Sequence, residues 1–378
     1  MIRIFAEPGS TKHRPDRLRR TTSFAEPGST KHTMDRRPAA SSSRRAPAAL
    51  IAVCALVLAA CSSTGGAQEE AAAGGGGGAG GVDTPRMTVA MITHQAPGDT
   101  FWDQVRTGAE ANAAKNNVEL NYANDPDAGN QANLVQNAID QGVDGIAVTL
   151  AYPDAVGPAA QRAIEAGIPV VAFNSGLDNW SDYGIQMYFG QDENLAGAAA
   201  AERLNEEGAQ NIVCVNQEQG QVALEARCAG VSENFDGNSE QLYVQGTDMP
   251  TVRSTISAKL QEDPSIDRVL TLGAPFALTA LQSVADAGSD ADVVTFDLNP
   301  DLLNAIQAGD IPWAIDQQPY VQGYLAVDSL WLVVNQGRTV GGGENVLTGP
   351  AFIDESNIDA VLDASSGGGG TEAAEASE

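Results

Sequence analysis

The chain is long enough for two domains, and its charge is unevenly distributed. It has 378 residues, with 49 Asp and Glu against 21 Lys and Arg, and a net charge of −28. Residues 1–60 hold 11 of the basic and 4 of the acidic side chains, which leaves 10 basic and 45 acidic ones for the rest. Affinity for nucleic acid depends on basic side chains, so this composition argues against a DNA or RNA partner.

The first 60 residues combine a repeat with the pattern of a bacterial lipoprotein signal peptide. Residues 5–13 recur as residues 24–32, and neither copy has core-like periodicity. From Met34 a basic segment leads into an apolar run at 46–60, which is too short to span a membrane comfortably. Small residues then precede Cys61. We expect translation to start at Met34 and Cys61 to be lipidated.

Four segments are therefore expected to lie outside the folded body. Residues 1–33 are interpreted as an upstream artefact of start assignment, 34–60 as the signal peptide, 61–85 as a flexible tether and 365–378 as a disordered acidic tail. The Gly run of the tether matches a G-x-G-x-x-G pattern, but no strand precedes it and no helix follows it. It is not interpreted as a phosphate-binding loop.

Between the tether and the tail, apolar segments of strand length alternate with segments of helical periodicity. The strand candidates are 88–92, 118–121, 145–149, 169–173, 185–189, 211–215, 241–244, 268–272, 293–296 and 313–315. The helix candidates between them include 101–116, 131–141, 155–166, 194–207, 251–262, 276–287 and 301–308. This alternation predicts an α/β fold with parallel sheets and right-handed crossovers. Ten strands without one obvious sheet suggest two similar lobes.

Two cysteines lie in this body. Cys214 ends a strand pattern and Cys228 opens the next helix pattern, so the two could lie close in space. Outside the cytoplasm they could form a disulfide. They could equally be two small buried residues.

Patterns of catalysis and metal binding are scarce. His94 is the single histidine after residue 60, no G-x-S-x-G or H-E-x-x-H motif occurs, and the cysteine spacing does not suit zinc. We expect no enzymatic activity, no cofactor and no metal. His94 is interpreted as an incidental residue at a strand end.

Polar and aromatic side chains follow several predicted strands. The clearest case is the stretch 293–324, where one buried strand ends at Asp297 and the next is followed by Gln317. Ligands bind at the carboxyl edge of such sheets, although Asp297 could instead only cap the next helix. Other strand ends are followed by further candidates, namely Asp99, Phe101, Trp102, Asn174, Glu225 and Arg227.

These residue types suit a neutral ligand rich in hydroxyl groups. Each hydroxyl both donates and accepts, so planar carboxylate, amide and guanidinium groups can bind adjacent hydroxyls in pairs. Aromatic rings can cover the apolar face of a sugar ring. The alternative for Phe101 and Trp102 is packing in the core.

The region 86–363 resembles periplasmic monosaccharide-binding proteins of the ribose- and galactose-binding type, which serve ABC importers. The motifs that carry the resemblance, in the expected order, are GDTFWDQVRTGA, VDGIAVTLAYPDAV, GIPVVAFNSG, FGQDENLAGAAAAE, ALEARCAG, VVTFDLNPD and AIDQQPYVQGY. The resemblance implies the type I periplasmic-binding fold, with two Rossmann-like lobes, three hinge crossings and sugar bound in the cleft. It places the N-terminal lobe at 86–190 and 318–350, the C-terminal lobe at 191–317 and 351–364, and the crossings near Gln191-Asp192, Gln317-Gln318 and Ala351-Phe352.

The resemblance also implies ligand contacts, position by position. These are Asp99, Phe101, Trp102, Asn174, Arg227, Asp297 and Gln317, with Glu225, Met249 and Ala274 as weaker candidates. Gly273-Ala274 stands where the family often has an Asn-Asp pair, and Met249 stands where a second stacking aromatic is expected. These departures leave the identity of the sugar open.

The function expected from the sequence is that of a lipid-anchored, monomeric substrate-binding protein of an ABC importer. Cys61 would hold it at the outer face of the cell membrane, beside its permease, and the ligand would be a small neutral sugar or a cyclic polyol. One alternative is an extracytoplasmic receptor of the same fold that presents a furanosyl signal or a sugar to a sensor. Another is a lipoprotein enzyme, against which the lack of a nucleophile–base set weighs.

Overall fold

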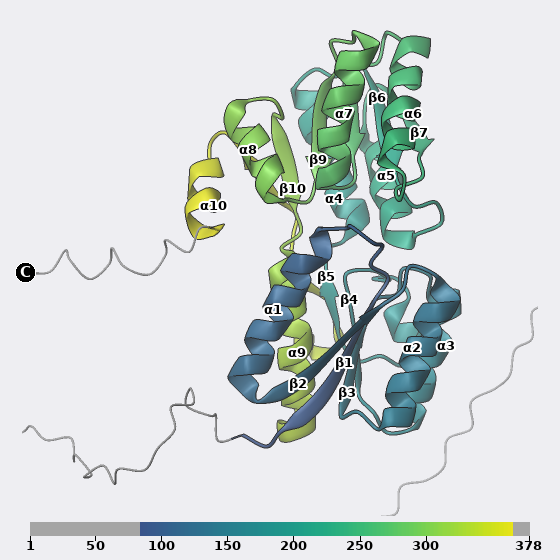
Figure 1. The fold of residues 1–378 in the computed structure, drawn as a ribbon, viewed down its shortest axis with the longest axis vertical. Coiled ribbons are helices and arrows are strands. Elements are labelled where there is room, and N and C mark those ends of the chain that lie inside the picture. Colours follow the sequence, from purple (N-terminus) through teal and green to yellow (C-terminus); the bar gives the residue numbers. More distant parts are fainter. Residues whose placement is uncertain (1–83, 366–378) are drawn as a thin grey trace, which may run out of the picture. The chain divides into compact units, whose positions relative to one another are not determined.

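The computed structural model describes residues 84–365, which fall within one compact unit of the chain. The expected signal peptide, Cys61, nearly all of the tether and the tail after Ser365 lie outside the described residues. The described part forms two α/β lobes, each built on a six-stranded sheet (Figure 1). The predicted fold class is confirmed.

The sheet of the first lobe is entirely parallel. Its strand order is β11-β5-β4-β3-β1-β2, with β1 (Met87–Thr93), β2 (Val118–Asn124), β3 (Gly145–Val148), β4 (Val170–Phe173), β5 (Tyr188–Gly190) and β11 (Val346–Leu347). All residues of β3, β4 and β5 are buried. Continuous apolar runs of this kind are typical of parallel strands covered on both faces.

The sheet of the second lobe repeats this order with one difference. Its strands run β12-β10-β9-β8-β6-β7, with β6 (Asn211–Asn216), β7 (Asn238–Tyr243), β8 (Arg268–Thr271), β9 (Asp292–Phe296), β10 (Trp313–Asp316) and β12 (Ala351–Asp354). The edge strand β12 pairs with β10 in the antiparallel direction, and the other pairs are parallel. The sequence does not predict β11 or β12.

Helices cover both faces of each sheet (Figure 1). The first lobe has α1 (Phe101–Asn116), α2 (Ala128–Gln141), α3 (Pro153–Glu165) and α9 (Pro319–Gln336), with α1 packed on α9 and α2 on α3. The second has α4 (Glu193–Glu206), α5 (Val222–Asn234), α6 (Met249–Glu262), α7 (Ala274–Ala287), α8 (Pro300–Ala308) and α10 (Ile358–Ser365), with α4 packed on α5 and α6 on α7. None of the helices within residues 84–365 combines the length and apolarity that a bilayer span requires.

The chain passes between the two sheets at three places. It does so between β5 and α4, at Gln191-Asp192, and between β10 and α9, at Gln317-Gln318, as the resemblance implied. The third passage lies between β11 and β12, at residues 348–350. This passage lies directly before Ala351-Phe352, near which the third crossing was expected; those two residues already pair with β10.

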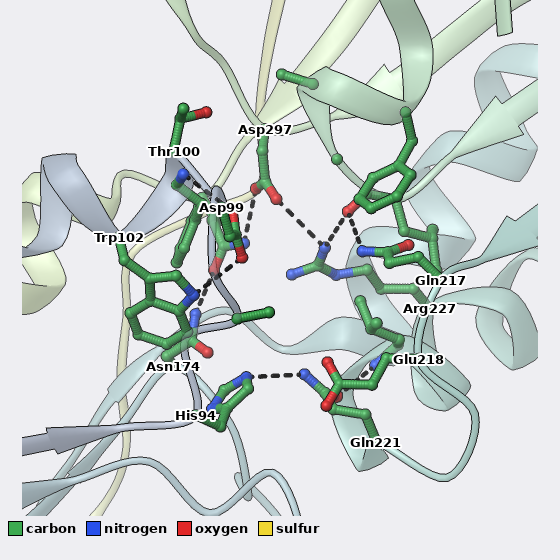
Figure 2. Close-up of a pocket in the computed structure, with 18 of the residues that line it drawn as sticks. His94, Asp99, Thr100, Trp102, Asn174, Gln217, Glu218, Gln221, Arg227 and Asp297 are labelled. Carbon is green, nitrogen blue, oxygen red and sulfur yellow. Dashed lines mark hydrogen bonds and ion pairs between the residues drawn. The ribbon is translucent and has the colours of Figure 1, made fainter. Parts of the chain in front are cut away.

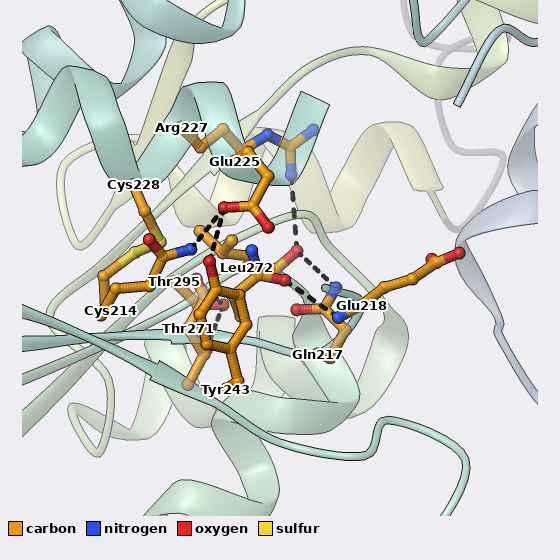
Figure 3. Close-up of a disulfide and its surroundings, with 12 residues drawn as sticks. Cys214, Gln217, Glu218, Glu225, Arg227, Cys228, Tyr243, Thr271, Leu272 and Thr295 are labelled. Atoms are coloured by element: carbon orange, nitrogen blue, oxygen red, sulfur yellow. Dashed lines mark hydrogen bonds between the residues drawn. A yellow bond between two sulfur atoms is a disulfide. The ribbon is translucent and has the colours of Figure 1, made fainter. Parts of the chain in front are cut away.

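A disulfide joins Cys214 on β6 to Cys228 on α5, with the two Cα atoms 5.9 Å apart (Figure 3). The sequence pattern suggested that a helix begins at Cys228, but in the structure it does not. Helix α5 begins at Val222, where the Gln221 side chain accepts a hydrogen bond from the Leu224 amide. Because the helix starts earlier, Cys228 lies in its middle, in the same buried core cluster as Cys214.

Candidate functional site

A cavity lies between the two lobes, at the carboxyl ends of their parallel strands (Figure 2). Its volume is about 70 Å³, where one water needs roughly 10–15 Å³, so it suits a compact ligand and not an extended chain. Its lining includes all seven main candidates from the sequence, namely Asp99, Phe101, Trp102, Asn174, Arg227, Asp297 and Gln317.

Asn174 and Asp297 are placed by the same backbone device in the two lobes. Each directly follows a strand, β4 or β9, and each has φ 65°, in the left-handed region. The amide of Asn174 donates to Phe189 O and that of Asp297 to Ile315 O, both at 2.8 Å. Asn and Asp adopt this conformation more readily than other residues with side chains, and such positions often mark functional sites.

Asp297 does not cap α8, which answers the alternative left open by the sequence. The cap is Asn299, whose side chain accepts from the Leu302 amide at 2.8 Å. The Asp297 carboxylate instead accepts from Gln317 Nε2 at 2.7 Å and lies 3.8 Å from Arg227 Nη1. Burial raises the pKa of Asp297 to about 7, although Arg227 and Gln317 oppose the shift.

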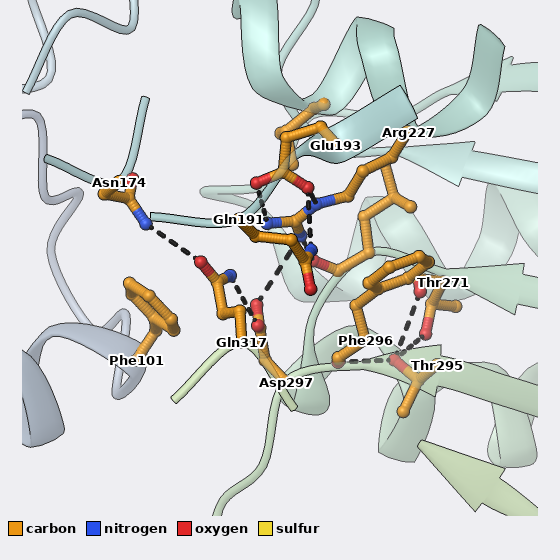
Figure 4. A network of polar contacts seen from close by, with 12 residues as sticks. Phe101, Asn174, Gln191, Glu193, Arg227, Thr271, Thr295, Phe296, Asp297 and Gln317 are labelled. Carbon is orange, nitrogen blue, oxygen red and sulfur yellow. Dashed lines mark hydrogen bonds and ion pairs between the residues drawn. The ribbon is translucent and has the colours of Figure 1, made fainter. Parts of the chain in front are cut away.

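Arg227 is buried on α5 between two carboxylates. Glu193 accepts hydrogen bonds from its Nε and Nη2, and Nη1 points toward Leu272 O at 3.4 Å and toward Asp297 (Figure 4). Burial works against the charged form, but the pKa of Arg227 is still raised because Glu193 and Asp297 outweigh it. Arg227 is therefore a fixed cation with one nitrogen directed at the cavity.

Asp99 and the two aromatic residues after it form the opposite wall. The Asp99 carboxylate accepts from the Phe101 amide at 3.1 Å and from Trp102 Nε1 at 3.0 Å. Burial raises the pKa of Asp99, against the effect of these two bonds. Phe101 and Trp102 belong to the core cluster of the first lobe and also line the cavity, so both interpretations of these rings apply.

Gln317 links the first lobe to Asp297. It lies at the second crossing and is 1% exposed. Asn174 Nδ2 donates to Gln317 Oε1 at 3.2 Å, while Gln317 Nε2 donates to Asp297 (Figure 4). The amide therefore joins a first-lobe residue to a second-lobe carboxylate.

Sequence reasoning missed five polar residues of the lining, namely His94, Thr100, Gln217, Glu218 and Gln221. His94 is not incidental to the cavity: burial lowers its pKa to about 3, so it stays neutral and accepts from Gln221 Nε2 at 3.3 Å. Its place directly after β1, the one available signal, is shared with many structural residues. Gln217 Oε1 is buried and finds no hydrogen-bond partner among the described residues.

The three weaker candidates have different outcomes. Ala274 lines the cavity at the start of α7. Glu225 does not, because its carboxylate accepts from the Gly220 amide, Gln241 and Tyr243 on the far side of α5 (Figure 3). Met249 opens α6 and lines a neighbouring hollow at the mouth of the cleft, with Pro275 and Phe276. Glu225 and Met249 therefore do not line the cavity in this structure.

The two lobes contact each other on both sides of the cavity. On one side the Val222 amide donates to Ala151 O at 3.1 Å, and Tyr152 Oη donates to Glu218 Oε1 at 2.9 Å. On the other side Gln104 Nε2 donates to Leu298 O at 2.8 Å. These contacts hold the two lobes together on either side of the cavity.

The site has hydrogen-bonding groups of both kinds and no arrangement typical of a metal centre. Within residues 84–365, His, Cys, Asp and Glu nowhere cluster in a way that could hold a metal ion. The donors include Arg227 Nη1, and the acceptors include the carboxylates of Asp99, Glu218 and Asp297. Such a set can bind and orient hydroxyl groups.

The periplasmic binding protein domain family matches residues 89–339. A solved structure from Acidothermus cellulolyticus 11B, described as a carbohydrate transporter in complex with myo-inositol, is 57% identical. It covers 75% of this chain and 99% of its own, with a TM-score of 0.74. An ABC sugar transporter (periplasmic sugar binding protein) from Legionella pneumophila is 25% identical, covers 69% and 99% of the two chains, and has a TM-score of 0.63.

Two relatives of lower sequence identity are named as binding proteins for sugars or a sugar alcohol. A xylitol-binding protein of Mycolicibacterium smegmatis is 28% identical over 74% of this chain and 80% of its own length. A xylose/arabinose-binding protein of Sulfolobus acidocaldarius is 27% identical over 63% of each chain, so the match spans less than two thirds of that relative. The resemblance seen in the sequence is confirmed, and the chain belongs to the periplasmic binding protein domain family.

Proposed function

We propose that this chain is a lipid-anchored substrate-binding protein of an ABC importer, which captures a monosaccharide or a cyclic polyol between its lobes. The observation that carries the proposal is the cavity between the lobes, in which hydrogen-bonding groups from both lobes and from the second crossing converge. A ligand with hydroxyl groups around a ring can bind such groups on all sides.

The composition of the cavity favours an uncharged ligand with one apolar face. The single guanidinium, that of Arg227, is paired with the buried carboxylate of Glu193, which leaves no free cation for a phosphate among the lining residues. Phe101 and Trp102 offer ring surface on one wall. The relative that contains myo-inositol and the xylitol-binding relative support a neutral polyol or sugar.

Binding would proceed by closure of the lobes without chemical change. In an open form, the contacts Tyr152–Glu218 and Gln104–Leu298 would be broken and the cavity exposed to solvent. A ligand that contacts both lobes binds the closed form more tightly and therefore shifts the equilibrium toward it. A permease could then recognise the closed form.

A calorimetric titration with myo-inositol, xylitol, D-ribose, D-xylose and L-arabinose tests the proposal. We expect at least one of these neutral ligands to bind. We expect Asp297→Ala or Arg227→Ala to weaken that binding by about 2–4 kcal/mol, because a buried partner loses a charge-assisted hydrogen bond.

Asp301→Ala is the matched control, because Asp301 is an exposed carboxylate four residues along the chain, in the first turn of α8. Its affinity should equal that of the wild type. Absence of binding to all five ligands would refute the proposed ligand class. Unchanged affinity in both site variants would remove Asp297 and Arg227 from the site.

The lipid anchor is the second part of the proposal and rests on the sequence around Cys61. An apolar run ends in small residues directly before this cysteine, and a Gly-rich tether follows it. A tether of this kind would let the lobes move freely near the membrane. We expect Cys61→Ser to move the protein from the membrane fraction to the soluble fraction, with ligand affinity unchanged. A variant that remains in the membrane fraction would count against lipidation.

A further inference from the structure

Glu193 is buried beside the cavity without lining it. It is the first residue of α4, directly after the first crossing, and is 5% exposed. Its carboxylate accepts from Arg227 Nε and, at 3.1 Å, from Arg227 Nη2. Gln191 Nε2 donates to the same carboxylate at 2.9 Å (Figure 4). Glu193 therefore holds two of the three guanidinium nitrogens.

The close packing of α4 on α5 fixes this pair in place. A Cβ atom on Gly197 of α4 would lie 2.3 Å from Arg227 O, and one on Gly230 of α5 would lie 2.4 Å from Asn194 O. Only glycine allows the two backbones to approach so closely. The close approach of the two helix backbones therefore holds the Glu193 carboxylate and the Arg227 guanidinium near each other.

The pairing determines which part of Arg227 a ligand meets. Nε and Nη2 face Glu193, so Nη1 is the nitrogen left toward the cavity, where it donates to Leu272 O at 3.4 Å and lies 3.8 Å from Asp297 Oδ2 (Figure 4). A ligand hydroxyl at this point would accept a hydrogen bond from a positioned donor. The positive charge of the guanidinium is already compensated by the Glu193 carboxylate, which lies on the side away from the cavity.

We infer that Glu193 is a specificity-determining residue, which makes the cavity select neutral polyhydroxylated ligands over sugar acids by pairing the charge of Arg227 and fixing its Nη1. Without this carboxylate, Arg227 would be a buried cation with only Asp297 as counter-ion, and an anionic ligand would supply the missing charge. The inference rests on the proposed function and adds to it the residue that sets charge preference.

The first test compares Glu193→Gln with Glu202→Gln in the full chain. Glu202 is an exposed residue of the same helix and receives the same chemical change. The neutral probes are myo-inositol and D-xylose, and the acidic probe is D-glucuronate. Titrations with them give the ratio of the affinity for a neutral probe to the affinity for D-glucuronate. We expect Glu193→Gln to lose roughly tenfold or more affinity for a neutral probe and to gain affinity for D-glucuronate. A ratio equal to that of Glu202→Gln would overturn the inference.

The second test needs no ligand and separates this inference from the proposed function. The groups that face Asp297 are Arg227, Gln317, Glu193 and Asp99, and the charge of Glu193 raises the pKa of Asp297. Carboxyl NMR should therefore show Asp297 titrating at a lower pH in Glu193→Gln and at the wild-type pH in Glu202→Gln. If no sugar binds the wild type, the proposed function fails, and an unchanged midpoint here would still refute the pairing role of Glu193.

Glu193→Asp keeps the inference testable if Glu193→Gln does not fold. The shorter side chain retains the charge but cannot reach both guanidinium nitrogens from the same backbone position. We expect it to keep the preference for neutral probes and to bind them more weakly than the wild type. Wild-type affinity, or a gain for D-glucuronate, would contradict the two-point contact.

Discussion

Asn174 and Asp297 occupy equivalent places in the two lobes, each after the third strand from the β11 or β12 edge. Both turn into the left-handed region, and their side chains meet through Gln317. The sequence favours the place of Asp297 but not this meeting, because an acid at the end of a buried strand lies at the ligand-binding edge of a sheet. Burial also disfavours the ionised form of Asp297, so the stability of the folded protein should depend on pH.

Asp297 should make the folded state lose stability as the pH rises. Its pKa is raised by burial from 3.8 to about 7, so between these pH values the folded state holds a proton that the unfolded chain has released. The contribution is fully present below about pH 4 and is lost as the pH passes 7, a change on the order of 4 kcal/mol. Asp297→Asn should therefore become more stable relative to the wild type across this range, as measured by urea unfolding from pH 4.5 to 7.5.

The exposed Asp301→Asn provides the control for this measurement. The difference in the free energy of unfolding between Asp301→Asn and the wild type should not show the rise with pH that is expected for Asp297→Asn. A constant difference between Asp297→Asn and the wild type across the range would show that Asp297 is ionised throughout.

At the scale of elements, the α/β alternation was readable because most strands are short buried apolar runs, although the edge strands β2 and β7 are partly exposed. All ten predicted strands are present, and α1 has the bounds that its periodicity predicts. The strands β11 and β12 were missed because β11 has two residues and β12 pairs at the sheet edge in the antiparallel direction. The sequence pattern placed the start of helix α5 too late because the capping residue is Gln221, which is not among the residues that usually signal a helix start.

The site was predictable only in part, for a reason that lies in long-range pairing. Residues that follow strands, such as Asp99, Asn174 and Asp297, are visible in one sequence because their position is local. Glu193 looks like an ordinary acid in the first turn of a helix, and its partner Arg227 is 34 residues away. Their contact depends on the glycines that bring α4 and α5 together, which the sequence shows only as small residues in two separate helices.

At the scale of the whole molecule, hydrogen bonds join the crossings to one another. Gln322 Nε2 donates to Gln317 Oε1 at 2.9 Å and lies 3.1 Å from Thr348 Oγ1, which itself donates to Gln317 O at 2.7 Å. The Thr348 amide donates to Gly190 O at 2.9 Å, beside the first crossing. Because Gln317 also contacts Asn174 and Asp297, the hinge and the cavity share one polar network. We expect movement of the lobes and binding of ligand to be coupled through it.

The most direct test of the account is the distance between the lobes with and without ligand. Spin labels at Asn137→Cys on α2 and Ala258→Cys on α6, both exposed positions on different lobes, report it by pulsed electron paramagnetic resonance. We predict that the ligand identified by calorimetry converts a broad distribution that includes longer distances into one narrow, shorter distance, and that Asp297→Ala needs more ligand for the same change. A distribution that stays the same at saturating ligand would contradict capture by closure of the two lobes.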